Sequence, residues 1–287
     1  MSTARLPRSY LYVPGNAPDK LAKALDRGAD ALILDLEDAV PLKEKNYARS
    51  AIVRWLREQP NVRDTQLWVR INHDPLRLSD ASALANIPAV TGLILAKVEG
   101  PGEVVAVGKL LDGLGDHDTL LMPMIETAKA VLSAAMIATR PRVHQLQIGE
   151  VDLTGETGIA PGHDESELAS IRTMIVLASA AAQINPPLGA VSRITTDLPA
   201  LEESTQRLRR QGFVGRACIH PAQIPVVHEV FTPSEDEVAE AESVIQYFAA
   251  REAEGRGVVL DSTGRLIDIA VLRGARKTLA LVSKAGR

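Results

Sequence analysis

The chain has 287 residues, of which 46% are hydrophobic and 24% charged, and its formal net charge at pH 7 is −4. This length suits one large domain or two small ones, and an acidic balance without a basic stripe argues against nucleic acid as a partner. No apolar run is long enough for a transmembrane helix, residues 1–8 lack the apolar middle of a signal peptide, and a single cysteine, Cys218, excludes an internal disulfide, so we expect a cytoplasmic protein with no membrane partner.

Short apolar runs alternate with longer segments of helical spacing over the first 231 residues. In chain order, the predicted strands are 9–13, 31–36, 66–71, 92–98, 119–125, 144–149, 188–194 and 214–219, and the predicted helices include 18–27, 42–58, 102–112, 127–139, 165–183 and 199–211. Apolar strands separated by polar helices indicate a parallel sheet covered by helices. The eight units predict an α/β fold, a (β/α)8 TIM barrel over residues 1–231. The alternative, an open doubly wound sheet, is disfavoured because no GxGxxG motif follows an early strand.

The pattern changes after residue 231. Residues 235–253 predict a long amphipathic helix, residues 255–271 two extended pieces around a turn at 262–264, and residues near 270–284 a last helix. A segment of this size is too short to form a core alone. We therefore predict a helix–hairpin–helix lid extension over residues 232–287 that packs on its own barrel or on a neighbouring subunit.

Charged and polar side chains follow five successive predicted strands. They are Asp35, Glu37 and Asp38, then Arg70 and Asn72, then Lys97 and Glu99, then Glu126, then Glu150 and Asp152. Any one of them could be a solvated loop charge. In a TIM barrel, however, the carboxyl ends of the strands surround one active-site mouth. Carboxylates that converge there raise one another's pKa or need a cation.

The residue types at these positions favour a hard metal ion. Oxygen donors without cysteine or histidine suit Mg²⁺, with Mn²⁺ as an alternative. Glu126 and Asp152 are the best candidate ligands, because each ends one of two neighbouring strands after an apolar run. Arg70 offers a planar fork for a substrate carboxylate. The mouth is therefore expected to take a small, oxygen-rich anion held by a metal and an arginine.

Short motifs follow one another along nearly the whole chain: RSYLYVPGN at 8–16, LDLEDAV at 34–40, VRIN at 69–72, KVE at 97–99, MIETA at 124–128, GEVDL at 149–153, GFVGRACIHPAQI at 212–224 and GRLID at 264–268. In this order they resemble the citrate lyase beta-subunit-like group of the HpcH/HpaI aldolase superfamily, which includes malyl-CoA and citramalyl-CoA lyases. The resemblance implies a magnesium-dependent TIM barrel with a C-terminal lid, assembled as a homotrimer or a hexamer.

The resemblance also implies roles for residues of the mouth. Glu126 of the ET pair and Asp152 of the GxxDL motif would bind the metal. Arg70 would bind the carboxylate of an α-keto acid. Glu37 and Asp38 would lie close to the metal and hold its water shell, with catalytic roles.

Three further residues complete the predicted site. By resemblance, Asp268 of the lid reaches a neighbouring subunit's site and acts as acid or base at the thioester α-carbon, and Arg8 contacts substrate or coenzyme A. Lys97 is predicted to bind substrate, and either to pair with Glu99 or to neutralise the acids of the LDLEDAV motif. The chain departs from the family's usual GAEDL, because the acid before Asp152 has moved to Glu150. This change leaves the predicted ligands in place and the substrate open.

The predicted function is reversible Claisen-type cleavage by a Mg²⁺-dependent carbon–carbon lyase. Its substrate would be a short 3-hydroxyacyl-CoA such as malyl-CoA or citramalyl-CoA, and its products an acyl-CoA and an α-keto acid. One alternative is a hydroxyacyl-CoA thioesterase that uses the same metal site. Another is a citrate lyase beta subunit that acts on a citryl-acyl carrier protein within a complex. Aldol cleavage without coenzyme A is a further activity of the same superfamily.

Overall fold

The computed structural model describes residues 6–59, 62, 64–252, 259–260 and 266–282. The chain divides into two compact units. The first unit comprises residues 7–228, and the second begins at Glu229. None of the described helices is long and apolar enough to cross a membrane.

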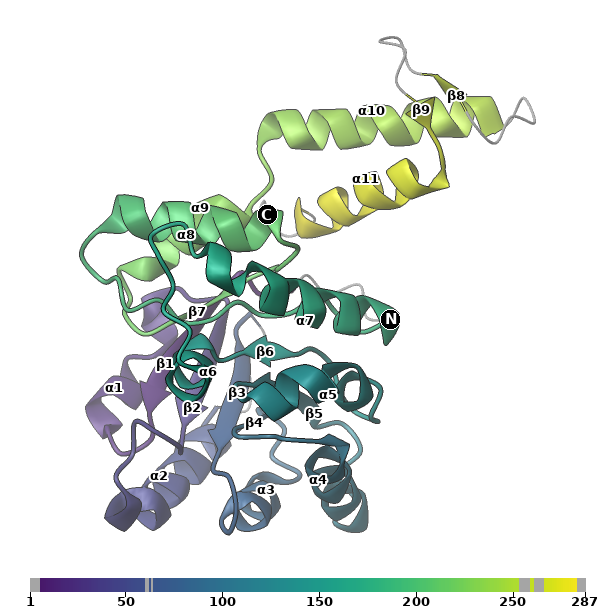
Figure 1. Ribbon diagram of the computed structural model, residues 1–287. Coiled ribbons are helices and arrows are strands. Elements are labelled where there is room, and N and C mark those ends of the chain that lie inside the picture. Colours follow the sequence, from purple (N-terminus) through teal and green to yellow (C-terminus); the bar gives the residue numbers. More distant parts are fainter. Residues whose placement is uncertain (1–5, 60–61, 63, 253–258, 261–265, 283–287) are drawn as a thin grey trace. The chain divides into compact units, whose positions relative to one another are not determined.

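A seven-stranded parallel sheet forms the centre of the first unit (Figure 1). Its strands are β1 (Ser9–Pro14), β2 (Ala31–Asp35), β3 (Gln66–Ile71), β4 (Gly92–Leu95), β5 (Leu120–Ile125), β6 (Gln147–Ile148) and β7 (Arg216–Cys218). They lie in the order β6-β5-β4-β3-β2-β1-β7. Because each strand pairs in parallel with its neighbour in the chain from β1 to β6, the carboxyl ends of these strands meet at one edge.

Helices on the outside of the sheet connect the strands (Figure 1). They are α1 (Pro18–Ala22), α2 (Lys45–Arg57), α3 (Arg77–Leu84), α4 (Pro101–Gly113), α5 (Ala128–Ala138), α6 (Glu150–Thr157), α7 (Ala169–Ala181), α8 (Leu198–Arg210) and α9 (Gln223–Phe231), with the short 3₁₀ helices η1 (Leu25–Arg27), η2 (Leu42–Glu44) and η3 (Ser166–Leu168). Side-chain caps mark where some begin: Thr127 accepts a hydrogen bond from the Ala130 N–H, and Asp197 from the Ala200 N–H, both at 3.1 Å.

Inward-facing side chains of the strands form a buried cluster inside the sheet. Its members are Tyr10, Ala31, Ile33, Trp68, Ile94, Met122, Met124 and Leu188. The strands' alternating side-chain directions explain the spacing of two residues between members on one strand. Gly92 leaves the space that the Trp68 ring fills, since a Cβ there would collide with it. This buried cluster fixes the strands whose carboxyl ends carry the predicted site residues.

The strand predicted over residues 188–194 does not form. Only Leu188 and Gly189 pair, through isolated bridges to Gln147 of β6 and Arg216 of β7. Beyond them, side chains rather than a strand bind the backbone: Arg216 Nε donates to the Ala190 carbonyl at 3.2 Å, and Gln223 Nε2 to the Ser192 and Ile194 carbonyls at 2.9 and 2.8 Å. The observed sheet therefore has seven strands instead of the eight predicted, and β6 is shorter than the predicted 144–149.

The second unit contains α10 (Glu235–Glu252), β8 (Val259–Leu260), β9 (Leu266–Ile267) and α11 (Ile269–Val282). Strands β8 and β9 are antiparallel. Phe248 of α10 and Leu272 of α11 are buried against each other, with Val244, Ile245 and Tyr247 around them. The predicted turn at 262–264 lies outside the described residues, and the role of a lid stays a prediction.

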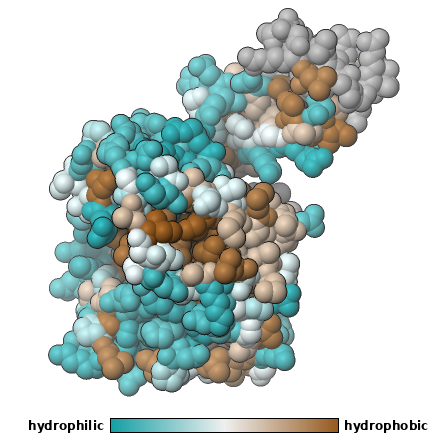
Figure 2. All heavy atoms as spheres, in the orientation of Figure 1, coloured by the Kyte–Doolittle hydropathy of each residue, from teal (hydrophilic) through white to brown (hydrophobic). Residues whose placement is uncertain are grey.

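Exposed apolar side chains gather on the face of the first unit over α5 and α7 (Figure 2). Leu132 and Met136 come from α5, and Met174 and Leu177 from α7, with exposed fractions between 41% and 79%. Contiguous exposed apolar groups of this kind mark interaction surfaces.

Candidate active site

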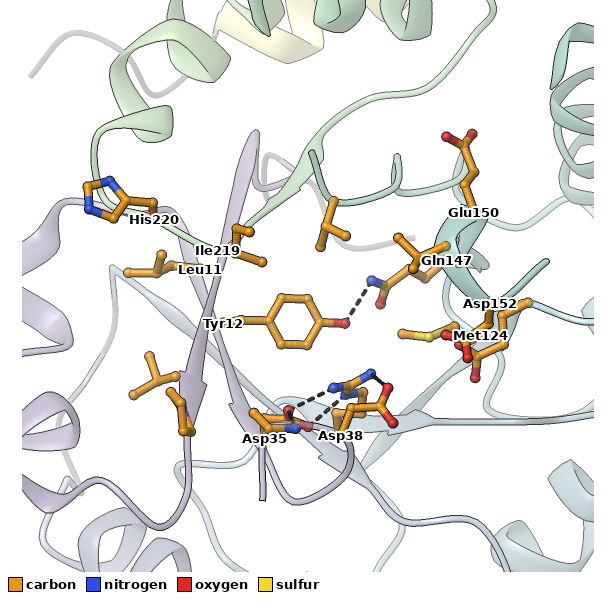
Figure 3. Close-up of a pocket in the computed structure, with 18 of the residues that line it drawn as sticks. Leu11, Tyr12, Asp35, Asp38, Met124, Gln147, Glu150, Asp152, Ile219 and His220 are labelled. Carbon is orange, nitrogen blue, oxygen red and sulfur yellow. Dashed lines mark hydrogen bonds and ion pairs between the residues drawn. The ribbon is translucent and has the colours of Figure 1, made fainter. Parts of the chain in front are cut away.

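A cavity of about 860 Å³ opens at the carboxyl ends of the strands in the first unit (Figure 3). One side of it is lined by Asp35, Asp38, Arg70, Glu126 and Asp152, which we call the acidic side. Lys20 of α1 and Arg27 of η1, both exposed, also line the cavity and form its basic side. Six of the residues predicted from the strand ends therefore line one cavity, namely these five and Glu150, whereas Glu37, Asn72, Lys97 and Glu99 are not among its lining residues.

Asp35, the last residue of β2, organises the acidic loop that follows it. Its side chain is 1% exposed and accepts backbone N–H groups from Glu37 at 2.9 Å and Ala39 at 3.1 Å. It also accepts Nε and Nη2 of Arg70 at 2.6 and 2.7 Å. Such a bidentate pair fixes both orientation and distance. Asp35 thus holds the loop and the guanidinium in register, as a structural residue.

The Arg70 guanidinium is already bound to carboxylates of its own chain. Its Nη1 lies 3.0 Å from Glu37 Oε2 and 3.2 Å from Asp38 Oδ2. Burial alone would lower the pKa of Arg70, but Tyr12 and the surrounding carboxylates raise it well above the ordinary value. Asp38 is 58% exposed and Asp35 only 1%, so a ligand carboxylate would displace Asp38 from the guanidinium far more easily than Asp35.

The pKa values of Glu37 and Asp38 are shifted in opposite directions. Burial and the neighbouring Asp38 raise the pKa of Glu37 to about 8. Burial opposes ionisation of Asp38 too, but the hydrogen bond with Glu37 and the charges of Arg70 and Lys97 lower its pKa. Lys45 steadies this loop, since its Nζ donates to the Leu36 and Glu37 carbonyls at 2.8 and 2.6 Å.

Lys97 connects the two predicted metal ligands. Its backbone N–H donates to Glu126 Oε1 at 2.6 Å, and its ammonium forms an ion pair with Asp152. Burial raises the pKa of Glu126 to about 7, although Lys97 opposes the shift. The ion pair considered between Lys97 and Glu99 does not form, because Glu99 pairs with Lys129 at 2.9 Å.

The donor set fits a hard divalent cation. Around the acidic side, Asp35, Glu37, Asp38, Glu126 and Asp152 face Arg70, Lys97 and Lys45, an excess of two negative charges when all are ionised. Nearby carboxylates add to burial in raising the pKa of Glu37 and of Glu126. In the part of the chain that the structure describes, no three His, Cys, Asp or Glu side chains converge to hold a metal alone. Water and substrate would complete the shell, as Mg²⁺ usually requires.

The loop before Asp152 is built for close approach. A Cβ at Gly149 would lie 2.5 Å from the Glu126 Cβ, so only glycine lets α6 begin beside Glu126. Glu150 forms an ion pair with the buried Arg172 of α7, with its oxygens 2.6 and 2.8 Å from Nε and Nη2. Glu150, the acid of the GEVDL motif that departs from the family pattern, therefore holds α6 against α7.

A family model described as HpcH/HpaI aldolase/citrate lyase matches residues 8–221. The chain belongs to this family. Its relatives include a (3S)-malyl-CoA thioesterase of Cereibacter sphaeroides, 33% identical over 95% of this chain and 93% of that protein, and the citrate lyase subunit beta of Leuconostoc mesenteroides, 30% identical over 99% and 95%. These matches indicate a carbon–carbon lyase of the aldolase/citrate lyase family.

A solved structure is similar over the whole chain. The crystal structure of CitE from Mycobacterium tuberculosis, in complex with magnesium, acetoacetate and coenzyme A, has a TM-score of 0.78 at 29% identity. The match covers 99% of this chain and 100% of that chain.

Two predicted site residues belong to other parts of the fold, Arg8 to the segment before β1 and Asp268 to the second unit. Arg8 precedes β1 at the amino end of the strands, where it pairs with Asp30 at 2.8 Å. The cavity opens at the other end of the strands, and the contact of Arg8 with substrate or coenzyme A stays a prediction. Asp268 belongs to the second unit, where its Oδ1 caps α11 by accepting the N–H groups of Ala270 and Val271 at 2.8 and 3.0 Å. Its acid–base role stays a prediction.

Two uncharged polar residues of the cavity escaped the sequence analysis. Tyr12 of β1 and Gln147 of β6 both line it, and Gln147 Nε2 donates to the Tyr12 hydroxyl at 3.0 Å (Figure 3). Neither belongs to a charged motif. The alternation of Gln145 and Gln147 in HQLQIG was the available signal, since it places two amides on the inner face of a strand.

Proposed function

We propose that this chain is a Mg²⁺-dependent lyase that cleaves a short 3-hydroxyacyl-CoA, of the malyl-CoA or citramalyl-CoA type, into an acyl-CoA and an α-keto acid. The observation that carries the proposal is the meeting of Glu126, Asp152 and Arg70 on one side of a single cavity. The solved relative whose complex contains magnesium, acetoacetate and coenzyme A supports the choice of ligands.

Glu126 and Asp152 would hold the metal, with Mn²⁺ as an alternative ion. When bound, Mg²⁺ would offset negative charge on the substrate oxygens that it contacts. Arg70 would bind the substrate carboxylate by exchanging Asp38 for it. Lys97, now paired with Asp152, would be released as a cation for the bound substrate.

The basic side of the cavity supports a coenzyme A thioester. Lys20 and Arg27 provide two exposed cations for phosphate groups. A volume of about 860 Å³ also exceeds the need of a keto acid of a few carbon atoms. A ligand with its acid end on the acidic side and its phosphates at Lys20 and Arg27 would contact both sides of the cavity.

Cleavage breaks the bond between the thioester α-carbon and the carbon that bears the hydroxyl group. Its electron pair stays on the thioester as an enolate, and the hydroxyl becomes the keto carbonyl as it loses its proton. We assign the Glu37–Asp38 pair as the acceptor of that proton through water. We assign Asp268 of a neighbouring subunit as the acid that protonates the enolate carbon.

The remaining architecture follows the same proposal. We propose a closed (β/α)8 barrel over residues 1–231, completed by the bridges of Leu188 and Gly189 to β6 and β7. Residues 232–287 would serve as the lid. We also propose a homo-oligomer, a trimer or a hexamer, in which the apolar face of α5 and α7 is covered by another subunit.

Two other functions have specific support. Thioester hydrolysis is favoured by the malyl-CoA thioesterase relatives and by the Glu37–Asp38 pair, which could activate a water. A subunit acting on a citryl-acyl carrier protein is favoured by the citrate lyase relative.

Product analysis by mass spectrometry tests the proposal. Malyl-, citramalyl-, methylmalyl- and citryl-CoA would each be incubated with the protein and Mg²⁺. Acetyl- or propionyl-CoA together with a keto acid would support the lyase. Free coenzyme A with a hydroxy acid would identify a thioesterase, and an acyl carrier protein that co-purifies would favour the complex subunit.

A further inference from the structure

Two tyrosine–glutamine pairs lie in successive layers inside the sheet, with opposite hydrogen-bond directions. In the lower layer, the Tyr10 hydroxyl donates to Gln145 Oε1 at 3.2 Å, and Gln145 Nε2 donates to the Pro186 carbonyl at 2.6 Å. In the upper layer, Gln147 Nε2 donates to the Tyr12 hydroxyl at 3.0 Å. The Tyr10 hydroxyl therefore donates its hydrogen bond to Gln145, whereas the Tyr12 hydroxyl accepts from Gln147 and can still donate to another acceptor.

The upper pair faces the cavity, and the lower pair does not. Tyr12 and Gln147 line the cavity, and Tyr10 and Gln145 are not among its lining residues. Gln147 is 1% exposed, and its Oε1 has no hydrogen-bond partner among the described residues. Buried polar atoms are almost always satisfied, so Gln147 Oε1 needs a donor from whatever fills the cavity, which marks the upper pair as part of a binding site.

The Tyr12 ring lines the cavity. Figure 3 shows it between Leu11 and His220 on one side and Met124 and Asp152 on the other. The Arg70 guanidinium lies 4.9 Å from the ring centroid. The segment that follows β1 carries the cations of the basic side, and the ends of β5 and β6 carry Glu126 and Asp152. A ligand that joins the two sides would fill the cavity that Tyr12 lines.

The thioester is the polar group next to the acid end of the proposed substrate. In the proposed substrate, it separates the acid end from the pantetheine and phosphates of coenzyme A. Its carbonyl oxygen takes the negative charge when the carbon–carbon bond breaks, and a fixed neutral donor stabilises such charge strongly. Burial raises the pKa of the Tyr12 phenol far above its usual value, so the hydroxyl stays protonated.

We propose that Tyr12, oriented by Gln147, donates a hydrogen bond to the thioester carbonyl oxygen and is thereby a catalytic residue. This inference rests on the proposed function as far as the ligand is a coenzyme A thioester. It does not depend on cleavage over hydrolysis, because the same oxygen becomes negative when water attacks the thioester.

The first test compares Tyr12→Phe with Tyr10→Phe. Each variant loses one hydroxyl from a tyrosine–glutamine pair, and Tyr12→Phe keeps the ring under Arg70. Loss of a single oxyanion donor lowers kcat roughly 100-fold or more. We expect this loss in Tyr12→Phe with little change in KM, and kcat within about twofold of wild type in Tyr10→Phe. Equal kcat in the two variants would overturn the inference.

The second test needs no turnover. Infrared difference spectra of acetyl-CoA labelled with ¹³C at the carbonyl would be recorded with wild type, Tyr12→Phe and Tyr10→Phe in the presence of Mg²⁺. We expect the carbonyl band to move to lower frequency on binding to wild type and Tyr10→Phe, and to return toward the free position in Tyr12→Phe. No shift with wild type, or the same shift in Tyr12→Phe, would overturn the inference. A protein that shows the shift but forms no acyl-CoA and keto acid from any of the substrates would refute the proposed function alone.

Discussion

Replacing Asp35 by alanine should destabilise the first unit far more than replacing Asp38, although both carboxylates bond to Arg70. Asp35 is 1% exposed and accepts two hydrogen bonds from the guanidinium and two from backbone N–H groups. Removing one partner of a buried ion pair costs about 3–5 kcal/mol of unfolding free energy. Asp38 is 58% exposed, and an exposed pair contributes less than about 1 kcal/mol.

Urea unfolding followed by tryptophan fluorescence measures this difference, since both tryptophans, Trp55 and Trp68, lie in the first unit. Arg70→Met in the Asp35→Ala background should recover part of the loss, because it removes the uncompensated buried charge. If Asp35→Ala and Asp38→Ala lose the same stability, the reasoning that burial separates the two contacts is refuted.

Three further predictions concern the metal, pH and the second unit. Glu126→Gln should abolish detectable Mg²⁺ binding in isothermal titration calorimetry, while its thermal unfolding without metal stays close to wild type. Glu37 and Glu126 have pKa values raised from 4.5 to about 8 and about 7, so the metal-free native state binds more protons than the unfolded chain between these values. Stability should therefore fall as pH rises from about 5 to 8, and Mg²⁺ should restore it most at the upper end; a Tm independent of pH would contradict this. Asp268→Asn should keep the α11 cap but lose turnover, whereas Asp268→Ala should also lose about 1 kcal/mol of stability; normal turnover of the Asn variant would assign the residue to structure.

The acidic side could be predicted because it depends on one regular feature. Carboxyl ends of neighbouring parallel strands converge, so Asp35, Arg70 and Glu126 had to meet if the strands were right. The register even sets Asp35 opposite Arg70 on β2 and β3. The sequence could not predict which carboxylate the Arg70 guanidinium would bind, because that choice depends on burial and on the turn after β2.

Other features depended on contacts between distant segments. The expected strand at 188–194 is replaced by side-chain bonds from Arg216 and Gln223 to its carbonyls. Arg8 fell within a family motif, but its position before β1 sends it to the opposite end of the strands. A local sequence pattern can indicate an apolar strand or a charged residue within a motif. It does not reveal which side chain from a distant segment will contact that strand or that residue.

The release of keto acid from malyl-CoA and citramalyl-CoA, titrated with Mg²⁺ after EDTA treatment, tests the central claim most directly. The account predicts no release without metal and recovery on adding Mg²⁺, with one acyl-CoA formed for each keto acid. It also predicts no recovery in Glu126→Gln. Full release after EDTA treatment, or recovery in Glu126→Gln equal to that of wild type, would contradict a metal held by Glu126 and Asp152.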